Sequence, residues 1–248
     1  MNQVNHNGYS VKIENVSKDY SYNGNSATVI KNISLNIKRG ELLLILGPSG
    51  SGKTTLLTII AGLLPPSTGD LFLFGKNILE YTKKELQKLR ASKIGFVFQT
   101  FNLIDAISSL DNIALCGRFA GKSKSDSTKM AKQISRSINI ENLNDKFPSN
   151  LSQGEKQRVA VARAFINQPE LILADEPTAS LESSQGLNII RLLHKYSRQQ
   201  NKSVVVVSHD RRICQYADRI INIQDGKIQS VETENRFDEN NANKQRGQ

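Results

Sequence analysis

Eight consecutive residues have the types and spacing that bind a phosphate group. The segment Gly47-Pro48-Ser49-Gly50-Ser51-Gly52-Lys53-Thr54 fits the pattern G-x-x-x-x-G-K-[ST], and Thr55 follows it. Glycines let the backbone wrap so that N–H groups point at phosphate oxygens, and a following helix adds its dipole. We expect Lys53 to meet the β- and γ-phosphates of a nucleotide and Thr54 to ligate Mg²⁺. The alternative is a glycine-rich turn with a chance Lys-Thr pair, which the flanking apolar strand and helix disfavour.

Two carboxylates follow a second apolar segment. Asp175 and Glu176 come directly after residues 171–174, and ligands of open parallel sheets bind at the carboxyl ends of their strands. Asp175 is therefore expected near the Mg²⁺. Glu176 can reach the water that attacks the γ-phosphate and act as its general base. The alternative is that the two acids only cap a helix.

Two further polar residues end apolar strands. Residues 204–207 lead to His209, which can hydrogen-bond a γ-phosphate at the same sheet edge. Residues 94–98 lead to Gln99, whose amide can bind Mg²⁺ or the attacking water. Taken alone, His209 would more often be a structural histidine and Gln99 would carry no signal, so both predictions depend on the strand-end positions of these residues.

A parallel sheet is needed to bring these residues together. Residues 42–46 form a continuous apolar run, typical of a strand buried on both faces, and the helix-favouring residues 54–64 follow the phosphate loop. Residues 171–174 and 203–207 are apolar strands separated by a helix carrying residues 189–193, an order that predicts parallel pairing.

The remaining segments predict two additions to this sheet. Apolar and polar residues alternate between residues 9 and 37, which indicates antiparallel strands, and helical spacing dominates from about residue 100 to 160. We predict an α/β fold: a P-loop NTPase core with a parallel sheet, an antiparallel β subdomain and an inserted α-helical subdomain. Residues 1–232 would form a single nucleotide-binding domain, and the polar residues 233–248 a disordered tail.

Composition limits what the chain can do. Its 248 residues are 38% hydrophobic and 23% charged, typical of a globular protein, and no segment approaches the ~20 apolar residues that span a bilayer. Residues 1–10 are polar, so we expect neither a signal peptide nor an anchor. Cys116 and Cys214 lack metal-ligand spacing and are expected to be reduced. The net charge of +10 would suit nucleic acid, anionic lipid or phosphate ligands and does not choose among them.

One motif separates this chain from other P-loop proteins. The stretch Leu151-Ser152-Gln153-Gly154-Glu155 lies between the phosphate loop and the acidic strand and resembles the signature motif of ABC ATPases. The other motifs then fall in that family's order, with Tyr20 where the adenine-stacking residue is expected. The resemblance covers about residues 11–231.

The resemblance implies an ATP-sandwich homodimer in which Ser152 and Gly154 of one subunit complete the ATP site of the other. Their position at the start of a helix would offer N–H donors to a phosphate, although Ser152 and Glu155 also fit a purely structural capping box. Three residues depart from the usual pattern at positions that bear on the rate and on the coupling between sites: Gln153 for Gly, Glu155 for Gln, and Glu182 for Asp in a later turn.

The chain looks most like the macrolide-efflux and lipoprotein-release branch, on residues 94–104 and 177–181. It is thus expected to bind and hydrolyse ATP with Mg²⁺ at the cytoplasmic face of the cell membrane and to drive a separate permease subunit, without nucleic acid. Phe101, Leu103 and Ile104 would either receive a helix of that subunit or pack in the chain's own core. Two alternatives are a soluble ABC ATPase acting on the ribosome or DNA, and a regulator that activates a cell-wall hydrolase through a membrane partner.

Overall fold

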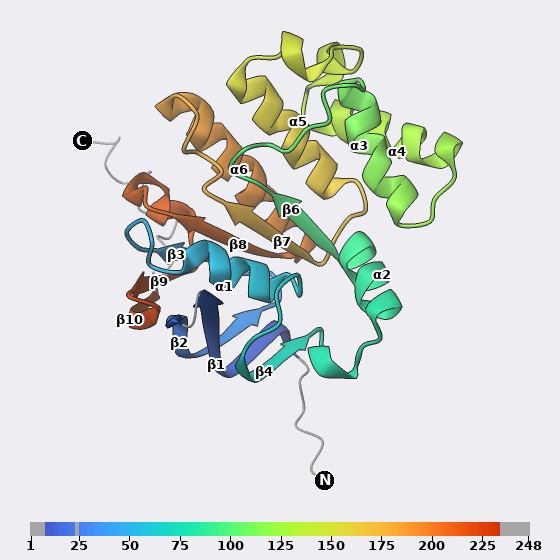
Figure 1. Cartoon of the computed structure of the whole chain (residues 1–248). Helices are drawn as coiled ribbons and strands as arrows, with labels where there is room; N and C mark the ends of the chain where they lie inside the picture. Colours follow the sequence, from blue (N-terminus) through green and yellow to red (C-terminus); the bar gives the residue numbers. More distant parts are fainter. Residues whose placement is uncertain (1–7, 23–24, 234–248) are drawn as a thin grey trace, which may run out of the picture.

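A six-stranded sheet forms the centre of the molecule (Figure 1). The structure is a computed structural model that describes residues 8–22 and 25–233. The strand order is β10-β9-β3-β8-β7-β6, and all neighbours pair in parallel except β10 with β9. The bounds are β3 Leu42–Leu46, β6 Ile94–Val97, β7 Leu171–Asp175, β8 Ser203–Ser208, β9 Arg219–Gln224 and β10 Lys227–Thr233.

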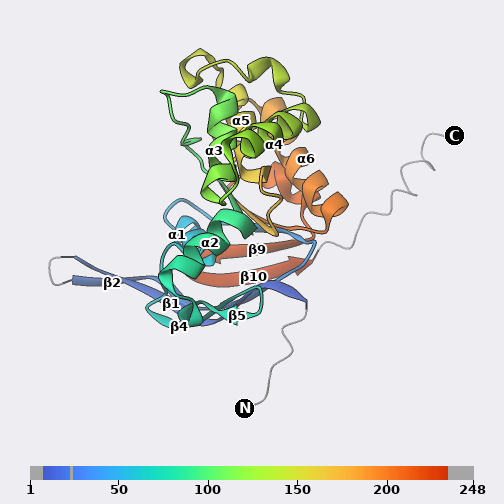
Figure 2. The ribbon, with the colours of Figure 1, turned by 90° about the vertical axis from the view of Figure 1, so that its right-hand side faces the viewer.

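A second, four-stranded antiparallel sheet covers one side of this core (Figure 2). It consists of β1 Tyr9–Tyr22, β2 Asn25–Lys38, β4 Thr68–Leu73 and β5 Lys76–Asn77. Helix α1, Lys53–Ile60, shares one buried apolar cluster with both sheets, including Ile13 of β1, Leu57 of α1 and Val205 of β8. The first helix of the phosphate site is therefore fixed from two sides.

The other face of the core sheet packs against α6, Ser183–Gln200, and part of α5, Gln153–Phe165. Helices α3, Ser109–Phe119, and α4, Lys124–Ser137, join α5 around a separate apolar cluster and gather at one end of the molecule (Figure 1). Helix α2, Lys83–Lys93, leads into β6. Short 3₁₀ turns lie at Ile78–Glu80, Glu141–Leu143, Pro148–Asn150 and Arg211–Tyr216.

The predicted fold class is confirmed: a mainly parallel α/β core, an antiparallel sheet and an inserted group of helices. The first helix differs from the expected 54–64, because it runs from Lys53 to Ile60. Gly62, with a φ of +64°, turns the chain out of the helix before the two prolines. Among the described residues, no helix is long and apolar enough to cross a membrane. The predicted disordered tail lies outside the described residues except for Thr233, which ends β10.

Candidate nucleotide site

The phosphate-binding loop connects β3 to α1 and has the backbone that its glycines allow. Gly52 has a φ of +97° and precedes Lys53, the first residue of α1. A Cβ at Gly52 would also lie 3.0 Å from the carbonyl oxygen of Val29, so a larger residue would be both strained and crowded. The loop therefore presents the N-terminal end of α1 to the adjoining cavity.

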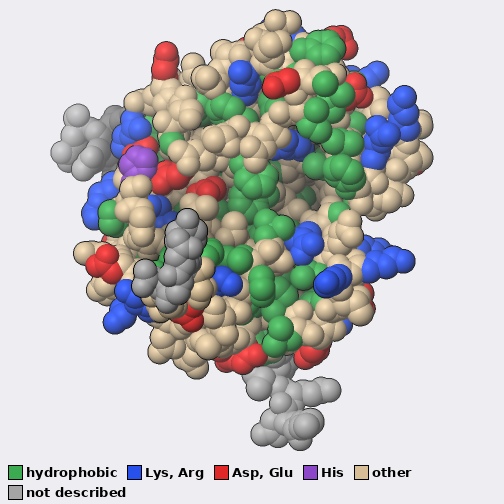
Figure 3. Space-filling view, in the orientation of Figure 1, with side chains coloured by type: hydrophobic (Ala, Val, Ile, Leu, Met, Phe, Trp, Pro, Cys, Tyr) green, Lys and Arg blue, Asp and Glu red, His purple; other side chains and the backbone are tan. Residues whose placement is uncertain are grey.

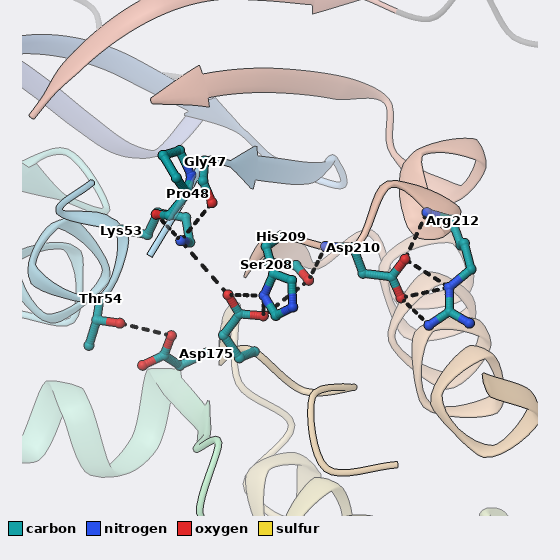
Figure 4. A network of polar contacts seen from close by, with 10 residues as sticks. Gly47, Pro48, Lys53, Thr54, Asp175, Ser208, His209, Asp210 and Arg212 are labelled. Atoms are coloured by element: carbon teal, nitrogen blue, oxygen red, sulfur yellow. Dashed lines mark hydrogen bonds and ion pairs between the residues drawn. The ribbon is translucent and has the colours of Figure 1, made fainter. Parts of the chain in front are cut away.

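Lys53 folds back over this loop. Its ammonium group donates hydrogen bonds to the carbonyl oxygens of Gly47 and Pro48, each at 2.9 Å, and the residue is only 7% exposed. Lys53 Nζ also lies 3.8 Å from Oε1 of Glu176. Figure 4 shows this cation between the loop and the carboxyl ends of the strands. A largely buried cation held by carbonyls and one carboxylate is well placed to exchange those partners for phosphate oxygens.

Asp175 faces the first turn of α1. The hydroxyl of Thr54 donates to Oδ1 of Asp175 at 3.1 Å, and Asp175 ends the buried strand β7 (Figure 4). Burial raises the pKa of the Asp175 carboxyl, while the hydrogen bond from Thr54 opposes that rise. A partly buried carboxylate beside a hydroxyl is a hard oxygen pair of the kind that Mg²⁺ prefers.

Glu176 lies at the meeting point of three elements. Its backbone has a φ of +43°, which is rare for a residue with a side chain, and its N–H donates to Val207 of β8. Its carboxylate oxygens lie 3.1 and 3.0 Å from Nδ1 of His209, and one accepts a hydrogen bond from Ser208 Oγ at 3.2 Å. The uncommon backbone conformation thus accompanies a carboxylate oriented by two neighbours.

A cavity of about 660 Å³ opens beside these groups, which is large enough for a nucleotide. It brings together most of the residues predicted from the sequence, including Gln99 after β6 and the exposed His209. Its lining residues are Val29, Pro48, Ser49, Gly50, Gly52, Lys53, Thr54, Thr55, Gln99, Glu176 and His209.

Other predicted residues are placed differently. Gly47 and Ser51 belong to the loop but do not line the cavity, and the side chain of Ser51 is buried. Tyr20 is 44% exposed in the β1–β2 hairpin, with Lys18 Nζ 5.7 Å from the centre of its ring. It does not line the cavity either. The adenine-stacking role predicted for it stays a prediction.

The signature residues also lie outside the cavity lining. Ser152 is exposed and caps α5 by accepting from Glu155 N at 3.2 Å, while Glu155 Oε2 accepts from Ser152 N at 2.8 Å. Gly154 is buried under Gln185 of α6, since a Cβ there would lie 2.1 Å from Gln185 Oε1. The predicted capping box is therefore present, and the exposed start of α5 contributes nothing to the lining of the chain's own phosphate-loop cavity.

Two site residues escaped the sequence-based prediction. Val29 lines the cavity, but an apolar residue in a strand carries no signal of a binding role. Ser208 orients Glu176, and its place directly before His209 at the end of β8 was the available signal.

A second, apolar groove of about 550 Å³ lies between the core and the helical end. It includes the strongly exposed Leu63 and Phe119 and also Phe98 and Ile104, and Figure 3 shows apolar side chains across this part of the surface. Of the three apolar residues predicted either for a groove or for the core, only Ile104 lines it. Phe101 is half-buried, and Leu103 packs against the apolar cluster of the helical end.

The fold and the cavity define a P-loop NTPase. The chain belongs to the ABC transporter family, whose sequence profile matches residues 30–179. The predicted resemblance to ABC ATPases and the predicted function as an ATP-binding, ATP-hydrolysing subunit of an ABC transporter are thereby confirmed.

Three relatives illustrate the similarity. The uncharacterized ABC transporter ATP-binding protein MJ0796 of Methanocaldococcus jannaschii is 40% identical over 92% of this chain and 99% of its own length. The putative hemin import ATP-binding protein HrtA of Staphylococcus haemolyticus is 38% identical over 89% of this chain and 99% of its own length. The macrolide export ATP-binding/permease protein MacB of Campylobacter fetus is 42% identical over 88% of this chain, which spans only 34% of MacB.

The fold similarity is equally extensive. The dimeric structure of MJ0796 in a post-hydrolysis state with ADP and Pi superposes with a TM-score of 0.84, at 40% identity, over 90% of this chain and 98% of that chain.

Proposed function

We propose that two copies of this chain clamp two ATP molecules between them and so drive a separate membrane-spanning permease. The observation that carries the proposal is the separation of Ser152 from the cavity that holds Lys53 and Glu176. Because the exposed start of α5 offers N–H donors and a positive dipole end, it suits a phosphate bound by a second copy. MJ0796, which is similar over nearly its whole length, has been seen as a dimer.

The chemistry follows from the groups around the cavity. Lys53 would exchange the carbonyls of Gly47 and Pro48 for phosphate oxygens and neutralise their charge. Glu176, oriented by Ser208 and His209, would accept the proton of the attacking water. The proton-accepting carboxylate and the phosphate-binding cation are already adjacent, so hydrolysis requires positioning more than covalent catalysis.

Mg²⁺ fits the oxygen donors of this site. Thr54 and Asp175 would hold the ion, with Gln99, which also lines the cavity, as a third predicted ligand. When bound, the ion would neutralise charge on the β- and γ-phosphates. A bound cation would favour the charged form of the Asp175 carboxyl and so oppose the rise that burial gives its pKa.

The apolar groove is the proposed docking site for the permease. Leu63 and Phe119 are 53% and 70% exposed, which is unusual for large apolar side chains in one concave surface. An amphipathic helix of the membrane subunit would cover them, and this contact would hold the chain at the cytoplasmic face of the membrane. The chain would then transmit force, and the substrate would be chosen by its partner.

Mixing two inactive variants tests the shared site. Lys53→Met removes the phosphate cation, and Ser152→Phe blocks the start of α5. Each homodimer should be inactive. A mixed dimer has one intact site, formed by the phosphate loop of one variant and the α5 of the other, so a 1:1 mixture should recover ATPase activity. Two inactive variants that stay inactive on mixing, although they form mixed dimers, would refute the shared site.

The membrane partner is tested by crosslinking in the native cell and purification from detergent-solubilised membranes. Recovery of a membrane protein with few spanning helices and a large external domain would support the permease or the hydrolase-regulating mechanism. Recovery of ribosomes or nucleic acid would favour a soluble ABC ATPase instead.

A further inference from the structure

We propose that Gln157 is a positioning residue that links the ATP bound at the start of α5 to the general base of the same chain. The inference rests on the proposed dimer, in which the ATP at α5 is held by the other copy. Gln157 would make each Glu176 sensitive to the nucleotide in the opposite site.

The contact that suggests this link is short and buried. The side-chain amide Nε2 of Gln157 donates to the carbonyl oxygen of Pro177 at 2.9 Å, and Gln157 is 1% exposed. Pro177 directly follows Glu176 in the chain. One hydrogen bond therefore connects α5 to the residue next to the proposed general base.

Gln157 is well placed to report movement at the start of α5. It lies three residues after Gly154, so the two share one side of the helix, one turn apart. Near its other end, α5 packs closely on β6: a Cβ at Gly95 would lie 2.4 Å from the carbonyl oxygen of Ala164. A displacement at Ser152 would thus pivot a rigid helix against the sheet and move Gln157 with it.

The acceptor of this hydrogen bond, Pro177, follows a residue with an uncommon backbone conformation. Glu176 holds a φ of +43°, its N–H donates to Val207, and its carbonyl accepts from Ala179 N at 3.1 Å. A residue with a side chain keeps such a backbone only where its surroundings impose it. The hydrogen bond to Pro177 is one of these constraints, and a shift of even a fraction of an ångström there would re-aim the carboxylate.

Gln157 is also a poor choice for stability alone. Its Oε1 is buried without a hydrogen-bond partner among the described residues, so only half of the amide is satisfied. A half-satisfied buried amide contributes little to folding, because the lost hydration of one atom offsets the bond made by the other. An apolar residue of similar length would fill the same space.

The test compares Gln157→Met with Arg158→Met, both in the full chain. Arg158 is the control, because it also donates from α5 to backbone carbonyls, those of Ile138 and Asn139, but these lie within the helical end. We expect Gln157→Met to lower kcat about tenfold, with KM changed less than twofold and the melting temperature not lowered. The Hill coefficient for ATP should fall toward one. Arg158→Met should keep kcat and the Hill coefficient.

Unchanged kcat and Hill coefficient in Gln157→Met would overturn the inference, as would a loss of activity that merely follows a lowered melting temperature. Failure of the unmodified chain to dimerise with ATP or to hydrolyse it would count against the proposed function instead, so the two failures are distinguishable.

Discussion

Nδ1 of His209 lies 3.0 Å from one carboxylate oxygen of Glu176 and 3.1 Å from the other. The side chain of His209 is 64% exposed, whereas that of Glu176 is 11% exposed. An exposed histidine that lines the cavity thus contacts a largely buried carboxylate. His209→Ala should remove one of the two neighbours that orient the Glu176 carboxylate and leave only Ser208 to do so. We expect kcat to fall roughly 10- to 100-fold with little change in KM, measured by phosphate release.

His194→Ala is the control for that experiment, because His194 contacts the ring of Tyr216 away from the cavity. Equal losses in both variants, or a His209→Ala enzyme with normal kcat, would remove His209 from the site.

The carboxylate of Glu155 occupies the positive end of α5, where the family's usual residue is a neutral Gln. Glu155 accepts from Ser152 N and lies 3.4 Å from Lys146 Nζ. A negative charge there should compete with the phosphate of the ATP bound by the second copy for the N–H groups and the positive end of α5. In a Glu176→Gln background, Glu155→Gln should strengthen ATP-dependent dimerisation about two- to tenfold, as measured by analytical ultracentrifugation. A weaker dimer would contradict this account of the departure.

Glu155 should also make the unfolding free energy of the chain depend on pH. Hydrogen bonding to the Ser152 backbone N–H lowers the pKa of Glu155. Because the folded-state pKa is below the unfolded value, the stabilisation is complete above the usual glutamate pKa and is lost as the pH falls through the lowered one. The difference in unfolding free energy between the unmodified chain and Glu155→Gln should therefore shrink on acidification from pH 6 to 3. Urea titrations at each pH would measure it, and a constant difference would show that Glu155 is not ionised in the cap.

Cys116 provides a natural reporter for the apolar groove, which it lines. Burial raises the pKa of its thiol, with the charge of Arg163 opposing the rise, and only the thiolate is readily alkylated. In Cys214→Ser, which leaves Cys116 as the single cysteine, alkylation should be slower than for a small free thiol at pH 8 and should still accelerate above pH 9. Membranes containing the docked permease should protect Cys116. Equal labelling with and without the permease would argue against docking in the groove.

Gly95 sets how closely α5 approaches β6. Gly95→Ala would push a methyl group toward the Ala164 carbonyl and the Ile172 side chain, and we expect it to destabilise the fold by about 1–3 kcal/mol in chemical denaturation. Gly8→Ala is the matched control, because nothing lies within 4 Å of the added carbon. A Gly95→Ala protein as stable as the control would mean that α5 can shift without cost.

Local sequence signals predicted most of the sheet and the site. The apolar run at residues 42–46, the glycine-rich loop and the start of α1 are contiguous, so the phosphate loop follows from one segment. Asp175 and Glu176 follow from the rule that parallel strands end at one edge. The contacts of Gln157 with Pro177 and of Gly154 with Gln185 could not be predicted, because they depend on how helices cross the sheet. The position of Tyr20 depends equally on the course of a hairpin.

The phosphate loop is contacted by residues of β9 and of the turn that follows it, which are made much later in translation. The N–H of Gly226, between β9 and β10, donates to Ser51 at 3.1 Å, and its carbonyl accepts from Lys31 N at 2.8 Å. A Cβ at Gly47 would lie 2.2 Å from the carbonyl oxygen of Ile223. At about 5–20 residues per second, a ribosome needs roughly 10–30 s to travel from Thr54 to Gly226. Throughout that interval the nascent loop lacks its hydrogen bond to Gly226, so the complete phosphate loop can form only after the turn between β9 and β10 has been made.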